Sequence, residues 1–115
     1  IYYPALVVPV EGKYGFVCPR EHISRLEAFL SECPNYLVIG TSGRDKDLLD
    51  LLGRCIGTCK LFVVVSPNHA EEVRGRFLSS VPQIGKASDD KLTCPLQFKD
   101  FVAEGKLEEF ISWCR

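Results

Sequence analysis

The sequence has no excess of positive charge. Its 14 Lys and Arg residues are balanced by 15 Asp and Glu residues, so the formal net charge is -1 at pH 7. The basic residues are also scattered along the chain, whereas nucleic-acid-binding domains usually carry a basic patch or stripe. We therefore expect no nucleic-acid partner.

Long apolar runs are absent as well. The longest ones, at 5–10 and 61–65, fall far short of the roughly 20 residues that a membrane-spanning helix needs. The chain also shows no signal-peptide pattern, in which a basic start precedes an apolar stretch and a cleavage site. We therefore expect no membrane partner.

Methionine is missing altogether, and the first residue is Ile1. We therefore expect an excised piece of a longer chain. With 115 residues, of which 46% are hydrophobic, this piece has the size and the core composition of one domain. We treat residues 1–115 as a single domain.

The cysteines lack the paired Cys-x-x-Cys spacing of zinc ribbons. There are six of them: Cys18, Cys33, Cys55, Cys59, Cys94 and Cys114. A disulfide framework is one interpretation, although such frameworks belong mainly to small secreted domains with little core. A zinc site is another, because Cys55 and Cys59 are four residues apart, as are Cys18 and His22. We favour a third interpretation, in which reduced, metal-free thiols act as small hydrophobic residues in a cytoplasmic protein.

Apolar runs and helical repeats alternate along the chain. Continuous apolar runs at 5–10, 36–39 and 61–65 predict buried strands, and 82–88 is a candidate for a short fourth strand. Amphipathic repeats predict helices at 21–33, 45–55, 70–80, 96–102 and 107–113. Strands that are apolar on both faces and separated by helices indicate a parallel sheet covered on both sides. The predicted fold class is α/β, a three-layer Rossmann-like half-domain with three main strands and helices on both faces.

Three parallel strands make only half of a doubly wound sheet. One edge of such a half exposes unpaired backbone groups unless another segment or subunit pairs with it. We therefore expect a partner at that edge, either a missing amino-terminal half or a second copy of the chain.

Four small residues join the strand at 36–39 to the leucine-rich helix at 45–55; they are Gly40, Thr41, Ser42 and Gly43. Turns of this kind lie at the carboxyl end of a parallel sheet, where α/β proteins bind ligands. The start of the helix offers free N–H groups and a positive dipole end, both of which suit phosphate. The alternative is that Ser42 or Asp45 only caps the helix and the glycines only turn the chain.

The strand end and turn at 37–42, Leu-Val-Ile-Gly-Thr-Ser, resemble the Gly-Thr-Ser motif of sirtuins, in the carboxyl-terminal half of their NAD-binding domain. In that family the turn contacts the phosphates and ribose of NAD. Gly40, Ser42 and Asp45 also fit the Gly-x-Ser-x-x-Asp pattern of the divergent sirtuin-like branch. The resemblance implies NAD as the cofactor, with Gly40, Thr41, Ser42 and Asp45 as binding residues.

The resemblance extends from about residue 3 to residue 68. In sirtuins the next strand ends at an Asn that contacts the adenosine ribose. Here the strand at 61–65 is followed by Ser66, Pro67 and Asn68. The resemblance therefore implies that Ser66 and Asn68 complete the nucleotide-binding set.

Much of the family pattern is absent from the chain. It has no Gly-Ala-Gly-x-Ser turn, no Asn-Ile-Asp segment and no catalytic His motif, and we expect His22 and His69 to be surface residues. The resemblance thus implies half a cofactor site without a catalytic residue or a metal. The parent would hydrolyse NAD or remove acyl groups from lysine.

Two other functions fit the same residues. Thr41 and Ser42 could bind the phosphate of another small molecule without any NAD, as hydroxyl-rich turns do in other α/β domains. The chain could also be a protein-interaction module that keeps the fold without a ligand, because a fold does not fix a function.

Overall fold

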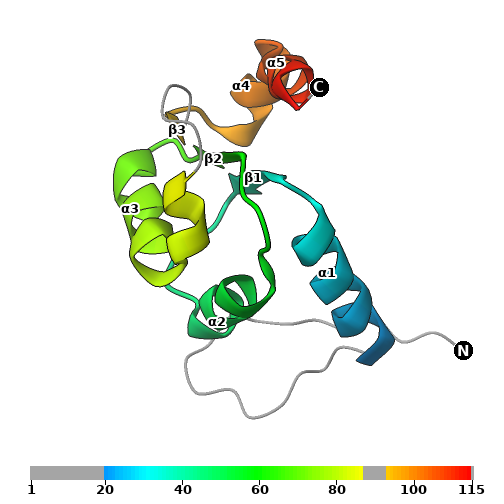
Figure 1. Ribbon diagram of the computed structural model, residues 1–115. Helices are drawn as coiled ribbons and strands as arrows, with labels where there is room; N and C mark the ends of the chain where they lie inside the picture. Colours follow the sequence, from blue (N-terminus) through cyan, green and yellow to red (C-terminus); the bar gives the residue numbers. More distant parts are fainter. Residues whose placement is uncertain (1–19, 87–92, 115) are drawn as a thin grey trace, which may run out of the picture.

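The computed structural model describes residues 20–86 and 93–114 (Figure 1). The strand expected at 5–10 and the cysteine Cys18 lie outside the described residues. No helix in the described ranges is long and apolar enough to cross a membrane.

The described residues form five α-helices, one 3-10 helix and three strands. The strands are β1 (Asn35–Ile39), β2 (Leu61–Val65) and β3 (Thr93–Cys94). The helices are α1 (Arg20–Glu32), α2 (Lys46–Cys55), α3 (Ala70–Ser80), η1 (Pro82–Lys86), α4 (Phe98–Ala103) and α5 (Lys106–Trp113). The expected helices and the two expected strands within these ranges are confirmed, with their ends shifted by a few residues at most.

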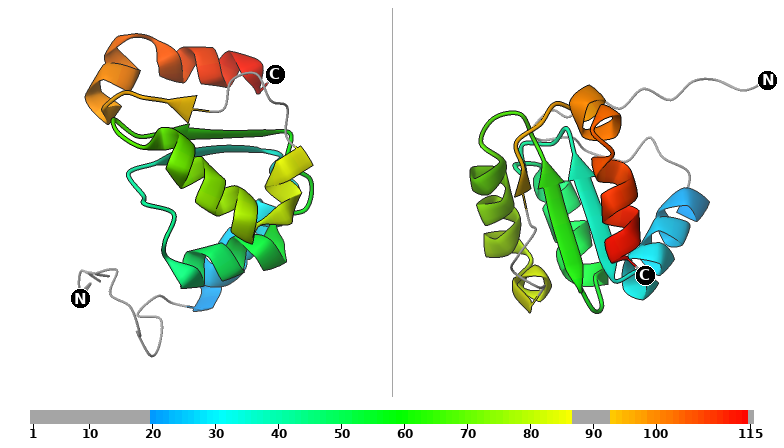
Figure 2. Two further views of the ribbon diagram at one scale, coloured as in Figure 1. Left: turned by 90° about the vertical axis from the view of Figure 1, so that its left-hand side faces the viewer. Right: turned by 90° about the horizontal axis from the view of Figure 1, so that it is seen from above.

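The three strands form a parallel sheet in the order β1-β2-β3 (Figure 2). Asn35 pairs with Leu61 at one end of the β1–β2 ladder and Ile39 pairs with Val65 at the other. All five residues of β2 are buried, as the unbroken run of apolar side chains predicted. β1 is only half-buried, and within the described residues it pairs with β2 alone.

Helices cover both faces of the sheet, so the predicted three-layer α/β architecture is confirmed. On one face, Phe62 and Val64 pack with buried side chains from α1, α2, α3 and η1. On the other face, Leu61, Val63 and Val65 pack with α4 and α5 (Figure 2). Alternate side chains of β2 therefore pack into two separate cores.

Aromatic rings occupy the centre of the larger core. The Phe62 and Phe77 ring centroids are 5.3 Å apart, and neither side chain is exposed. Tyr36 lies 6.2 Å from Phe62, and its hydroxyl donates a hydrogen bond to the Leu30 carbonyl at 2.7 Å. These contacts join α1, β1, β2 and α3 into one packed unit.

The expectation of a short strand at 82–88 is wrong, because Pro82–Lys86 forms the 3-10 helix η1. Pro82 has no N–H to give to a ladder, and the Ile84 N–H donates to the Val81 carbonyl three residues back. The Gln83 side chain donates to the Gly53 carbonyl of α2 at 2.8 Å, which fixes η1 against that helix. The third strand of the sheet is instead β3, whose two residues pair with Val64 and Val65.

Candidate functional site: two loops at the carboxyl edge of the sheet

Two loops follow the carboxyl ends of neighbouring parallel strands. The β1 loop comprises residues 40–45, and the β2 loop comprises residues 66–69. Because Ile39 and Val65 are partners in the ladder, the two loops leave the sheet at the same edge. The structure thus brings Gly40, Thr41 and Ser42 to the same end of the sheet as Ser66 and Asn68.

Gly40 leaves the backbone of the β1 loop open to a ligand. Its φ of 73° lies in the left-handed region that favours glycine. A Cβ built on it would meet nothing within 4 Å. Gly40 is thus required by its conformation, and the space beside it is free for another molecule.

Gly43 has a different role, because it packs the β1 loop against α3. Its φ is 68°, and a Cβ here would lie 3.2 Å from both the Phe77 ring and the Val73 carbonyl. The Gly43 N–H donates to the Thr41 hydroxyl at 3.1 Å. This glycine is buried and faces the protein, so only Gly40 is free to face a ligand.

Asp45 caps helix α2, which is the alternative that the sequence left open for it. Its Oδ1 accepts a hydrogen bond from the Leu48 N–H at 3.1 Å. Asp47 adds a second carboxylate in the first turn of the helix. Since these carboxylates already complement the helix dipole, the start of α2 is a poor phosphate site as it stands. The N–H groups of Thr41 and Ser42 lie upstream of the cap, and no hydrogen bond within the described residues engages them.

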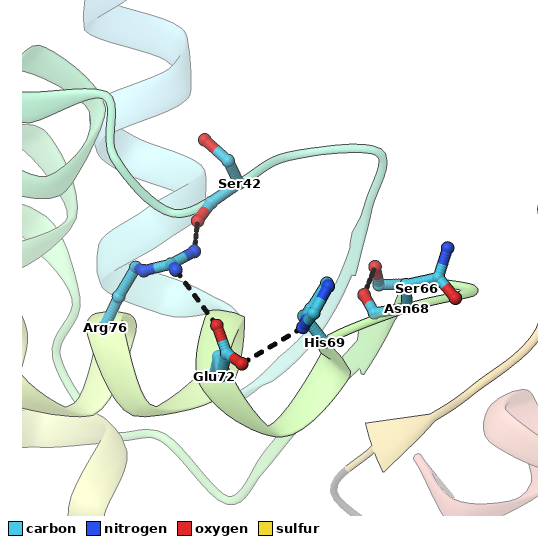
Figure 3. Close-up of polar contacts among 6 residues, drawn as sticks. All are labelled: Ser42, Ser66, Asn68, His69, Glu72 and Arg76. Carbon is cyan, nitrogen blue, oxygen red and sulfur yellow. Dashed lines mark hydrogen bonds and ion pairs between the residues drawn. The ribbon is translucent and has the colours of Figure 1, made fainter.

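The β2 loop is held to the sheet by its first residue. The Ser66 N–H donates to the Cys94 carbonyl of β3 at 3.1 Å, and the Ser66 hydroxyl donates to the Asn68 carbonyl at 2.6 Å. The Asn68 side chain is exposed, three residues beyond the end of β2 (Figure 3). Its amide can therefore serve as donor and acceptor for a polar ligand.

A chain of polar contacts on α3 connects the two loops (Figure 3). Arg76 donates from Nη1 to the Ser42 carbonyl at 2.7 Å, and its Nη2 lies 3.3 Å from Glu72 Oε2. The other oxygen of Glu72 lies 3.0 Å from His69 Nδ1. His69 has a φ of 61° and immediately precedes α3. Sequence reasoning missed Arg76 and Glu72, because Arg76 and Ser42 are 34 residues apart and no motif links them.

The loops supply hydroxyls, amide groups and open backbone, and these groups can bind a sugar or a nucleotide. No group of three or more His, Cys, Asp or Glu side chains that could hold a metal ion occurs among the described residues. The described part of the chain also places no cysteine in either loop. The site is therefore suited to holding a ligand through hydrogen bonds.

The five described cysteines are free thiols, and none of them is a residue of either loop: Cys33, Cys55, Cys59, Cys94 and Cys114. Burial raises the pKa of Cys59 and of Cys114. The pKa of Cys94 is also raised, mainly by burial, although nearby Lys106 acts in the opposite direction. A thiol with a raised pKa is mostly protonated near neutral pH and is a weak nucleophile.

Comparisons of the chain with protein-family models, with curated proteins and with solved structures find no match.

Proposed function

We propose that this chain is the NAD- or adenosine-nucleotide-binding half of a sirtuin-like domain. The observation that carries the proposal is the conformation of Gly40, which is left-handed and has empty space where a side chain would stand. A glycine of this kind at the carboxyl end of a parallel strand lets a ligand approach the backbone closely. The proposed contacts come from Gly40, Thr41, Ser42 and Asn68, with Ser66 shaping the β2 loop.

The proposed role of Asp45 is indirect. Its carboxylate caps α2 and fixes the point where the β1 loop enters the helix. We therefore place the ligand at the Thr41 and Ser42 end of the loop, where N–H groups and hydroxyls are free to donate. Ribose hydroxyls and a diphosphate both accept hydrogen bonds of this kind.

The parent protein would consume NAD, by hydrolysis or by removing acyl groups from lysine. The sequence lacks the catalytic His motif of the family, so we expect this chain to be inactive by itself. The wall around the nicotinamide ribose would come from a missing amino-terminal half or from a second copy of the chain. The half-buried strand β1, at the edge of the described sheet, is where we place that partner.

Calorimetric titration of the full 115-residue chain with ADP-ribose, NAD and ribose 5-phosphate tests the proposal. We expect ADP-ribose to bind and Gly40→Ala to weaken its binding about tenfold, which corresponds to roughly 1.4 kcal/mol. The matched control is Gly105→Ala, which lies between α4 and α5, because Gly105 has a similar φ of 71° and a Cβ there would meet only Glu108 Oε2, at 3.9 Å. Both variants carry the same left-handed strain of about 1 kcal/mol. A difference in ADP-ribose affinity between them therefore reports the loss of the ligand contact at Gly40.

The titration also separates the alternatives. Ribose 5-phosphate binding as tightly as ADP-ribose would favour a general phosphate site over a nucleotide site. Absence of binding by all three ligands would contradict the proposal. It would favour the protein-interaction module, for which the exposed side chains of Phe29 and Phe98 are the supporting observation.

A further inference from the structure

We propose that Arg76 is the positioning residue of the nucleotide site, holding the β1 loop in its binding conformation and joining it to the β2 loop. This inference rests on the proposed function and names a residue outside the sirtuin-like motif. Arg76 lies on α3, and its side chain is 30% exposed, against 61% for Glu72 and 69% for His69. It is the most enclosed member of the polar chain shown in Figure 3.

The peptide group between Ser42 and Gly43 is held at both ends. Its carbonyl accepts from Arg76 Nη1 at 2.7 Å, and its N–H donates to the Thr41 hydroxyl at 3.1 Å. A trans peptide group is planar, so fixing both ends fixes its orientation. The hydroxyl of Thr41 is thereby oriented as well, and its own proton remains available to a ligand.

Packing of Gly43 does not by itself select this orientation. The contacts with Phe77 and Val73 fix where the loop sits on α3. A glycine at positive φ still allows the preceding peptide to flip, which would turn the Gly43 N–H toward Arg76. Arg has five donors and no acceptor, so it binds the carbonyl and disfavours the flipped peptide. Arg76 therefore selects one of the two loop conformations.

The same guanidinium reaches the second loop through Glu72. Arg76 Nη2 contacts one carboxylate oxygen of Glu72, and the other oxygen contacts His69 in the β2 loop. The planar guanidinium of Arg can donate to the Ser42 carbonyl and to the Glu72 carboxylate at the same time, whereas the ammonium of Lys is a point charge. Arg76 does not touch the proposed ligand. It acts by holding Ser42, and it connects the two sides of the site.

Amide hydrogen exchange of the ligand-free, 15N-labelled chain tests the positioning role directly. In Arg76→Gln we expect the Gly43 amide to exchange about tenfold faster, because the flipped peptide breaks its bond to Thr41. Arg76→Lys keeps a donor for the Ser42 carbonyl and should restore part of the protection. The matched control is Arg25→Gln, which removes the same charge from the exposed surface of α1. An unchanged Gly43 exchange rate in Arg76→Gln would overturn the proposal.

Titration of the same variants with ADP-ribose tests the consequence for binding. We expect Arg76→Gln to weaken binding about tenfold, Arg76→Lys to restore part of it, and Arg25→Gln to match the unmodified chain. Unchanged affinity in Arg76→Gln would also overturn the positioning role. Failure of the unmodified chain to bind ADP-ribose would instead overturn the proposed function, while the Gly43 exchange rate would still decide whether Arg76 orders the loop.

Discussion

A Cβ on Gly57 would lie 2.8 Å from the backbone carbonyl oxygen of Ser31. The segment after α2 therefore passes against the end of α1 at a distance that only glycine permits. The Lys60 N–H donates to the Pro34 carbonyl at 2.7 Å, and this hydrogen bond joins the residue before β2 to the residue before β1. This close approach sets how α1 joins the core.

Gly57→Ala should therefore destabilise the protein. The clash is with backbone, which cannot rotate away as a side chain can, and we expect a loss of about 1–3 kcal/mol in the free energy of unfolding. Gly53→Ala is the matched control, because its Cβ would lie 3.7 Å from the Ser80 carbonyl, an ordinary contact, within helix α2. There alanine should raise the stability by up to about 1 kcal/mol. Urea unfolding of the two variants checks both signs, and equal stability would contradict the interpretation.

Phe77→Ala should be among the most destabilising single changes in the chain. The ring is fully buried, packs against Phe62 and lies under Gly43. Its removal leaves a cavity in the larger core, for which we expect a loss of about 3–5 kcal/mol. Phe98→Ala, at a side chain that is 56% exposed, should change stability by less than about 0.5 kcal/mol. Thermal unfolding of both variants measures the difference.

Stability should fall in alkaline solution. Burial raises the pKa of Cys59 and is the main cause of the raised pKa of Tyr36. An acid with a raised pKa in the folded state loses its proton more readily when unfolded, so its stabilising contribution is complete below the unfolded pKa and is lost as the pH rises through the folded pKa. For the thiols the decline should begin above about pH 8.5. Urea unfolding under reducing conditions between pH 7 and pH 10 measures it. Cys59→Ala should make the decline shallower, and an identical slope in that variant would count against this assignment.

The chain alone should not turn over NAD. Cleaving the bond to nicotinamide requires the reacting ribose to be positioned beside a nucleophile or water, and positioning of this kind can lower a barrier by roughly 7–11 kcal/mol. The residues Ser42 and Asn68 would hold only the adenosine and phosphate end, and binding that end without contacts to the reacting end lowers no barrier. Ser42→Ala should weaken adenosine-nucleotide binding. Nicotinamide release that scales with protein concentration and disappears in Ser42→Ala would contradict this prediction.

The parts of the fold that follow local sequence rules were predictable. The apolar runs gave β1 and β2, and the leucine spacing gave α2 with Asp45 at its start. β3 could not be foreseen, because a two-residue strand is defined by its partners Val64 and Val65 rather than by a pattern of its own. Pro82–Lys86 was mistaken for a strand because one apolar residue, Ile84, is buried in a turn that local hydrogen bonds stabilise.

In the site, too, the features that follow local sequence rules were predictable and those that depend on distant residues were not. Its glycines and hydroxyls follow a strand directly, so the motif at 40–42 placed them at the carboxyl edge of the sheet. The sequence did not distinguish Gly40 from Gly43, because the difference depends on Phe77 and Val73, which lie 30 or more residues further along the chain. Arg76 was missed for the same reason: its partner Ser42 is close in space only after β1, β2 and α3 have packed together.

The order of the strands across the sheet, β1-β2-β3, is also their order along the chain. During synthesis, each strand can therefore pair with its neighbour once the segment between them has emerged. The face that carries Leu61, Val63 and Val65 is the exception, because α4 and α5, which cover it, are the last described elements of the chain. A nascent chain that has emerged from the ribosome only as far as Ser80 thus presents an apolar sheet face without its cover, and transiently exposed apolar surface of this kind favours aggregation.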